Sequence, residues 1–300
     1  MTIWFILARA VHIGACLLFF GVFAFDRFVA AVVFPQNHFD AASYWKSLVK
    51  IFSSLLLPII FLSGLAWFAL AAMIMSGEPP QTEILKTVWR QTQFGAAWRA
   101  HLFFWVAAVV VAILFRSPRF QTWLQLVFSG ALLGSLAWAG HGLEGSRWHL
   151  FADVLHLLTA GFWPAGLLPF WLLLRRLRQV LETTSSFSIV ALVRRFSAVS
   201  LAAVSVLVVT GWVNSWFLAG SFSNLLAHTY GRFLLLKIAL FVLTVVLGAV
   251  NLLRLKPRLA LENSEKAAAQ MQLNVQAELF LGTAVIVVVA ILGTLPPANP

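Results

Sequence analysis

Acidic residues and cysteine are scarce in this chain of 300 residues. It contains 10 Asp and Glu residues and a single cysteine, Cys16, whereas 61% of its residues are hydrophobic. Charged residues make up only 10% of the sequence, which is too little to cover the surface of a soluble domain. One cysteine excludes an internal disulfide framework and Cys-x-x-Cys chemistry. The composition therefore predicts an integral membrane protein.

Uncharged stretches are long enough to cross a membrane as helices. A hydrocarbon core of about 30 Å needs roughly 20 helical residues. We expect an all-α polytopic protein, a single domain over residues 1–300 with a bundle of about eight transmembrane helices. The first is expected to be a retained span rather than a cleaved signal, because no basic region precedes it. The predicted helices cover residues 3–25, 49–75, 98–115, 120–141, 150–174, 196–219, 232–253 and 275–295.

Basic residues are distributed unevenly between the two sets of connections. One set carries Arg27, Lys46, Lys50, Arg116, Arg119, Arg175, Arg176, Arg178, Arg194, Arg195, Arg254, Lys256, Arg258 and Lys266. The other set carries only Lys86, Arg90, Arg99, Arg147 and Arg232. The positive-inside rule places the richer set in the cytoplasm. Both termini are then expected in the periplasm of a bacterial inner membrane.

Several function classes find no support in the sequence. The net charge of +11 is spread over helix ends rather than gathered in a patch, so nucleic acid is not an expected partner. No glycine-rich phosphate loop precedes a helix, and no Ser-His-Asp arrangement has supporting context. We therefore expect a binding or transport protein embedded in lipid, with a redox enzyme as the other class.

Histidines provide the main functional signal. Of the seven in the chain, those mapped to the predicted periplasmic side are His12, His101, His141, His149, His156 and His228, whereas His38 maps to the other side. Imidazole binds metals and haem but is unfavourable against lipid. Several imidazoles near one membrane face indicate a transition-metal site or a redox cofactor.

One face of the predicted helix 150–174 concentrates polar groups. His149, Asp153, His156 and Trp163 follow helical spacing and lie on that face. Asp153 could accept the second ring N–H of a ligating histidine and fix its tautomer. The alternative is that His149 and Asp153 are merely interfacial residues, whereas burying an unused His156 would be costly.

The first predicted helix carries a second candidate set. His12 and Cys16 share a face with Arg9, which needs a partner or water, so this face is expected to look into the bundle. Cys16 could be a soft ligand for a cuprous ion or a small apolar filler. His101 is a further candidate ligand, or an interfacial residue near the end of its helix.

Other polar or soft residues carry weaker signals. Lys237 could pair with an anionic group such as a haem propionate or a quinone head, or extend outward to the interface. Met73 and Met75 do not face each other on a helix, which disfavours a paired thioether site. The remaining polar residues within predicted spans are Asn214, Asn251 and Glu278.

Several motifs resemble those of the copper resistance protein D family of bacterial inner-membrane proteins. They are the segments 140–142, 153–156, 161–163, 210–216, 230–237, 278–282 and 292–297, with looser agreement at 9–12 and at His101. The resemblance implies an eight-helix protein acting in copper uptake or homeostasis. It also implies a small periplasmic copper-binding partner, which would be a separate chain.

Two main interpretations remain open at this stage, beside a third in which the protein is a non-catalytic assembly partner whose histidines are incidental. In the first, the protein takes copper at the periplasmic face, with His12, His101, His141 and His156 as ligands and His149 and Asp153 as auxiliary groups. In the second, some of these histidines hold a b-type haem that passes electrons from quinol to periplasmic copper or another acceptor. Plausible ligands are concentrated in the predicted outer half of the bilayer, an asymmetry that suits a receptor or redox site as well as a channel.

Overall fold

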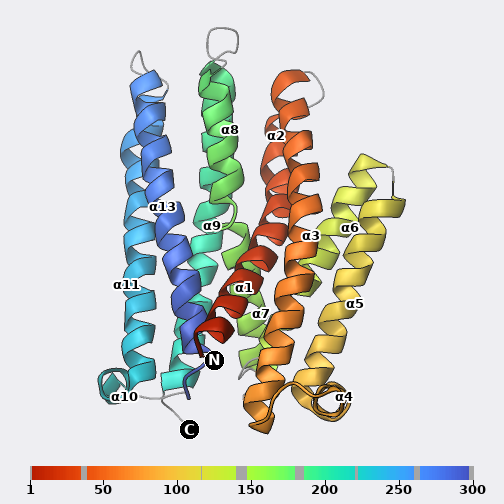
Figure 1. The fold of residues 1–300 in the computed structure, drawn as a ribbon. Coiled ribbons are helices and arrows are strands. Elements are labelled where there is room, and N and C mark those ends of the chain that lie inside the picture. Colours follow the sequence, from red (N-terminus) through yellow and green to blue (C-terminus); the bar gives the residue numbers. More distant parts are fainter. Residues whose placement is uncertain are drawn as a thin grey trace.

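The computed structural model describes residues 2–34, 39–115, 117–139, 147–179, 186–219, 222–259 and 264–296. Within these residues the backbone is helical apart from turns and short connections (Figure 1). The segments long and apolar enough to cross a membrane number eight, which confirms the predicted all-α bundle. They are Thr2–Val33, Ala41–Ser76, Gln93–Leu114, Phe120–Ala139, Trp148–Gln179, Ser188–Phe217, Thr229–Arg258 and Glu265–Leu292.

The helices follow one another up and down the bundle. The first span consists of α1 (Thr2–Phe25), a π-helical turn η1 (Asp26–Ala30) and α2 (Ala31–Val33). Then come α3 (Phe39–Ser76), α5 (Gln93–Leu114), α6 (Pro118–Gly134) with the 3₁₀ turn η2 (Ser135–Ala139), α7 (Arg147–Phe162) and α8 (Leu167–Gln179). The last spans are α9 (Ser186–Ala219), α11 (Thr229–Val250) with a π-helical turn η4 (Asn251–Leu255) and α12 (Lys256–Arg258), and α13 (Ser264–Leu292).

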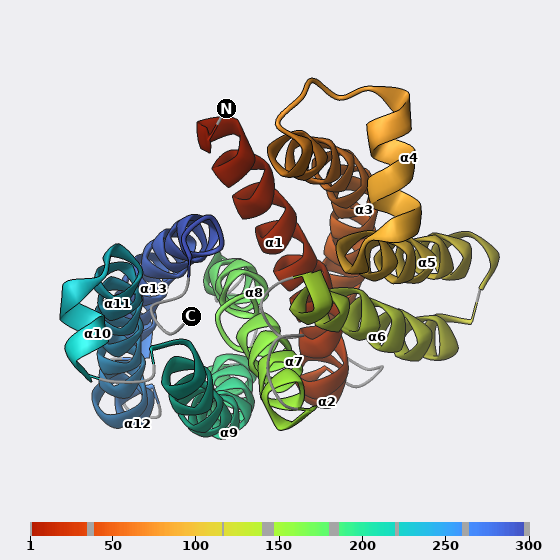
Figure 2. The same ribbon diagram turned by 90° about the horizontal axis from the view of Figure 1, so that it is seen from below.

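Two features differ from the sequence prediction. The helix expected over residues 150–174 is broken into α7 and α8 by a turn at residues 163–166. Pro164 cannot donate a backbone hydrogen bond, and a Cβ on Gly166 would lie 2.3 Å from the Phe162 carbonyl oxygen. In addition, an amphipathic helix, α4 (Thr82–Gln91), connects α3 to α5 and lies across the end of the bundle (Figure 2). A short α10 (Phe222–Ala227) precedes α11.

Helix α1 lies at the centre and joins two groups of helices. It packs against α3 and α6 on one side and against α7 and α13 on the other (Figure 2). One core cluster is built mainly from α1, α3, α5 and α6, and the other from α8, α9, α13 and the end of the first span. Close packing of α1 on α7 requires glycine, since a Cβ on Gly21 would lie 2.6 Å from the Gly161 carbonyl oxygen.

The two ends of the bundle differ in charge. The chain termini, α4 and α10 lie at one end, which we call the terminal end (Figure 1). The opposite end, which we call the basic end, carries Arg175, Arg176 and Arg178 at the end of α8 and Arg194 and Arg195 in the first turns of α9. Arg254, Lys256 and Arg258 lie there as well, in η4 and α12.

Candidate metal centre

The side chains of His12 and His101 meet inside the first group of helices. His12 on α1 is 0% exposed and His101 on α5 is 5% exposed. Their Nε2 atoms lie 3.1 Å apart. The Cys16 thiol lies one helical turn beyond His12, and its Sγ is 3.7 Å from the His12 Nε2. In the described part of the chain, only these residues form a group of three potential ligands within 4.8 Å of one another.

The tautomer of His12 is set by groups on α3. Its Nδ1 lies 3.1 Å from the Ile60 carbonyl oxygen and 3.1 Å from the Ser63 Oγ. A carbonyl oxygen only accepts hydrogen bonds, and the Ser63 hydroxyl donates its own proton to the Ile59 carbonyl at 2.6 Å. We therefore assign the ring proton to Nδ1, which leaves a lone pair on Nε2.

The tautomer of His101 is set in the same way by α6 and η2. Its Nδ1 lies 2.8 Å from the Ser135 Oγ, and that hydroxyl donates to the Leu132 carbonyl oxygen at 2.7 Å. The Ser135 oxygen is then the acceptor for the Nδ1 proton of His101. In these tautomers both Nε2 atoms, 3.1 Å apart, offer a lone pair that a cation between them could share.

Aromatic side chains enclose the two imidazoles. The rings of Trp67 and Trp98 have centroids 5.5 Å and 5.3 Å from that of His12. The Arg9 guanidinium stacks on Trp67, 4.6 Å from the ring centroid. Gly64 provides the space for His12, because a Cβ there would lie 3.1 Å from its Cε1. The centre is therefore buried among aromatic rings, which strengthens electrostatic interactions within it.

The polar residues of α7 lie in a different group, which also involves α9 and α11. The His156 Nδ1 is 3.0 Å from the Thr210 Oγ1, and the Asn214 Nδ2 donates to the Asp153 Oδ1 at 3.0 Å. Lys237 of α11 interacts electrostatically with both Asp153 and His156. We call these five residues the α7–α11 polar group. The structure thus divides the predicted site residues between two places.

The remaining candidates do not join the centre around His12. His149 is 4% exposed and lies near the α7–α11 polar group, where it interacts electrostatically with Asp153. Its ring centroid is 4.8 Å from that of Phe217 on α9. His141 and His38 fall outside the described residues. His228 is exposed at the start of α11, and Met75 at the end of α3 is 56% exposed. Neither belongs to the group of potential ligands around His12.

The supporting residues of the centre were not singled out from the sequence. Ser63 and Ser135 fix the two tautomers, while Trp67 and Trp98 form the walls. Each serine is a small polar residue within a long apolar stretch, as Ser53, Ser54 and Ser129 are too, and this is the only signal that the sequence offers. Intramembrane serines commonly satisfy their hydroxyl on their own helix, so this signal does not reveal a histidine on a neighbouring helix.

Comparison with known proteins agrees with this arrangement. A family model described as copper resistance protein D matches residues 190–292, and one for the N-terminal domain of copper resistance protein D-like proteins matches residues 1–150. Copper resistance protein D of Pseudomonas syringae pv. tomato is 36% identical over 245 residues, which cover 76% of this chain and 77% of that protein.

Two further relatives are more distant. The copper transport protein CutJ of Bacillus subtilis is 31% identical over 70% of this chain and 38% of its own length. The inner membrane protein YebZ of Escherichia coli is 29% identical over 69% of this chain and 70% of its own length. No solved structure matches the chain. With its eight spans and these matches, the chain is a multi-pass inner-membrane protein and belongs to the copper resistance protein D family.

Proposed function

We propose that this protein binds a single cuprous ion between His12, His101 and Cys16 and handles copper as its cargo. The observation that carries the proposal is the pair of Nε2 atoms held 3.1 Å apart, with the Cys16 thiol beside them, in a buried, aromatic-walled centre. Two relatives named for copper and the two matching family models make copper the first choice of ion.

The geometry suits a three-coordinate ion. With metal–nitrogen and metal–sulfur bonds of about 2.0 and 2.3 Å, ligands spread at about 120° would lie about 3.5 Å apart for the two nitrogens and about 3.7 Å for nitrogen and sulfur. The Nε2–Nε2 distance is 3.1 Å and the distance from Sγ to the His12 Nε2 is 3.7 Å. A shift of a few tenths of an ångström in the imidazoles accommodates the ion.

Charge and ligand type favour Cu(I) over divalent ions. A thiolate is a soft ligand that prefers Cu(I), and one thiolate cancels the single charge of the ion. A divalent ion would leave a net positive charge in a centre whose three ligand residues are at most 5% exposed. The α7–α11 polar group lacks a thiol and includes the Lys237 ammonium, so the proposal leaves Asp153 and His156 out of this ligand set.

Position along the helices gives the proposal a direction. His12 lies about 15 Å along α1 from Thr2, and His101 about 12 Å along α5 from Gln93, so the centre is in the half nearer the terminal end. If this end faces the periplasm, as the positive-inside rule predicts, copper enters there and moves inward. A separate small periplasmic copper-binding protein would then be the donor.

The haem alternative is less compatible with the geometry at this centre. Axial imidazoles lie on opposite faces of a porphyrin, whereas the Nε2 atoms of His12 and His101 approach to 3.1 Å and Trp67 and Trp98 pack around them. A macrocycle would have to displace both tryptophans. We therefore expect the purified protein to show no Soret band.

The proposal is tested by titrating Cu(I) into the purified protein against a chromophoric chelator under reducing conditions. We expect one equivalent to bind the wild type, with a loss of at least about 100-fold in affinity in His12→Ala and in His101→Ala, because each loses one of three bonds to the ion. Cys16→Ser should bind more weakly and lose the copper–sulfur scattering in X-ray absorption.

His228→Ala is the matched control, because this histidine is exposed and lies outside the centre. It should bind Cu(I) like the wild type. In cells, expression of the wild type should increase copper accumulation, and expression of His12→Ala should not. Unchanged Cu(I) affinity in both His12→Ala and His101→Ala would exclude the centre as the copper site.

A further inference from the structure

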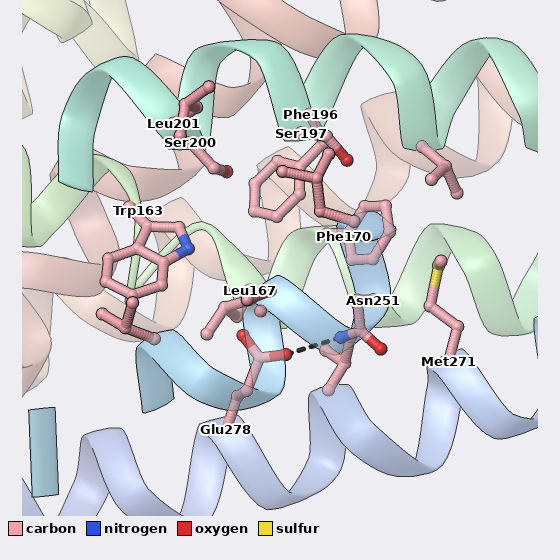
Figure 3. A pocket seen from close by; sticks show the side chains of 16 residues that line it. Trp163, Leu167, Phe170, Phe196, Ser197, Ser200, Leu201, Asn251, Met271 and Glu278 are labelled. Atoms are coloured by element: carbon pink, nitrogen blue, oxygen red, sulfur yellow. Dashed lines mark hydrogen bonds between the residues drawn. The ribbon is translucent and has the colours of Figure 1, made fainter. Parts of the chain in front are cut away.

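A cavity of about 130 Å³ lies in the second group of helices, away from the metal centre (Figure 3). Its walls come from α8, α9, α11 with η4, and α13. Most of the lining is apolar, including Trp163, Phe170, Phe196 and Met271. The polar groups on its wall are the side chains of Ser197, Ser200, Asn251 and Glu278 together with the indole N–H of Trp163.

Glu278 is the one titratable residue of this lining. It is 2% exposed, and it lies halfway along α13, about 21 Å from either end of the helix. The Asn251 Nδ2 donates to its Oε1 at 2.7 Å, as the dashed line in Figure 3 shows. The Asn274 Nδ2 in turn donates to the Asn251 Oδ1 at 2.8 Å.

The local backbone is adapted to this carboxyl group. Asn251 is the first residue of the π-helical turn η4, a distortion that often occurs at functional sites. Gly248, one turn earlier, lies beside the carboxyl group, since a Cβ there would make an ordinary contact with the Glu278 Oε2 at 3.9 Å. The same position would be 3.9 Å from the Trp163 ring, so the carboxyl group and the indole share this space.

No cation accompanies Glu278 in the described part of the chain. Among those residues, the ion pair found is between Lys86 and Glu83 on α4. The other charged and titratable side chains that the structure describes on the surrounding elements α1, η1, α7, α8, α9, α11, η4, α12 and α13 do not line the cavity. They are Arg9, His12, Cys16, Asp26, Arg27, His149, Asp153, His156, Arg175, Arg176, Arg178, Arg194, Arg195, Tyr230, Arg232, Lys237, Arg254, Lys256, Arg258, Glu265 and Lys266. An ionised carboxylate at this depth would be unpaired and costly.

Ser200 provides an independent indication of a ligand. Its hydroxyl oxygen is buried, lies on the cavity wall and has no hydrogen-bond partner in the described structure. At about 30 Å³ per molecule, the cavity has room for about four waters. The Ser200 hydroxyl and the free oxygen of Glu278 would hydrogen-bond to such waters.

We infer that this cavity is a proton-binding site, with the proton carried on the Glu278 carboxyl group and exchanged with water held by Ser200. Protonation transfers H⁺ from a cavity hydronium to the Glu278 oxygen that Asn251 leaves free and leaves a neutral water, and deprotonation reverses the step. The oxygen donors are hard ligands, which disfavours Cu(I) here. The protein then has a protonation step distinct from copper binding.

Infrared difference spectroscopy of the full chain in lipid nanodiscs tests this inference. The wild type minus Glu278→Gln should show the carbonyl stretch of a protonated carboxyl group at neutral pH, and this band should shift to lower frequency in D₂O and disappear as the pH is raised. Glu265→Gln, at an exposed position on the same helix, should leave the band intact. Sodium at constant pH should not affect it.

Two results would overturn the inference. The first is the absence of a carboxylic acid band attributable to Glu278 at any pH at which the protein stays folded, and the second is loss of the band on adding sodium, which would make this a sodium site. If Glu278→Gln does not fold, Ser200→Ala replaces it. The carboxylic acid band in Ser200→Ala must then lie at a different frequency from the band in the wild type. None of these infrared measurements depends on copper, so a failure of the proton site can be distinguished from a failure of the proposed copper site.

Discussion

The Ser135 hydroxyl determines which nitrogen of His101 is available to a metal. The Ser135 Oγ accepts a hydrogen bond from the His101 Nδ1 at 2.8 Å, and the hydroxyl donates a hydrogen bond to the Leu132 carbonyl oxygen. We predict that Ser135→Ala lowers Cu(I) affinity by about 10- to 100-fold, because the imidazole loses the partner that holds its tautomer and orientation. Competition titration with a chelator measures the change.

Ser129→Ala is the matched control for this substitution. Ser129 is also fully buried on α6, but its hydroxyl bonds only to the Leu126 carbonyl oxygen of its own helix. Its removal should leave Cu(I) affinity within a factor of about two. An equal loss of affinity in both variants would mean that α6 packing, rather than the hydrogen bond to His101, supports the centre.

The sequence predicted His12 and His101 individually but not their contact. Each is an imidazole in an apolar span, a combination that indicates function. Their meeting depends on which helices are neighbours, and nearly uniform apolar helices show little periodicity from which to deduce this. Cys16 was correctly expected on the face of His12, yet its closeness to the His101 ring follows only from the packing of α5 against α3.

At the scale of elements, the sequence predicted the number of spans better than their ends. Helices α3, α9 and α13 begin at Phe39, Ser186 and Ser264, each about ten residues before the predicted start. These helices begin before the apolar stretch, in sequence that contains charged and polar residues, and hydrophobicity therefore does not reveal their first turns. The break between α7 and α8 was missed because apolar residues continue through it, although Pro164 and Gly166 mark the position.

The end of the Arg9 side chain on α1 lies against Gly293, just after α13. A Cβ on Gly293 would occupy the place of the Arg9 guanidinium. We predict that Gly293→Ala lowers stability by about 0.5–2 kcal/mol, because the guanidinium must move and loses its stacking on Trp67. The midpoint of thermal unfolding in detergent should fall accordingly.

Gly282→Ala is the control on the same helix. A Cβ at Gly282 has no atom within 4 Å, so the substitution adds a methyl group in open space and removes a flexible residue from a helix interior. Its unfolding midpoint should stay the same or rise slightly. If both variants were equally destabilised, the Arg9 contact would not be the cause.

At the scale of the whole molecule, α1 separates two regions of different chemistry. The metal centre lies in the group with α3, α5 and α6 and combines imidazole with thiol. The α7–α11 polar group and the Glu278 cavity lie in the other group, and neither contains a thiol. The proposed copper and proton sites therefore use different side chains and would not compete for the same ligands.

The side of the membrane from which the proposed copper and proton sites are reached depends on the orientation of the bundle. The charge of the two ends of the bundle predicts this orientation. The basic end should face the cytoplasm. The native Cys16 is 1% exposed, so single cysteines can be introduced without removing it. We predict that Lys86→Cys on α4 reacts with a membrane-impermeant maleimide in intact spheroplasts, because α4 lies at the terminal end, whereas Arg258→Cys, exposed at the basic end, reacts only in inverted vesicles.

The wild type serves as the control in the labelling experiment and should remain unlabelled in both preparations. The reverse pattern would place the metal centre in the cytoplasmic half of the bilayer. Because His12 and His101 lie nearer the terminal end, the side on which that end lies is the side from which an ion has the shorter path to them. The labelling pattern therefore decides which side of the membrane the centre is nearer, without any measurement of copper.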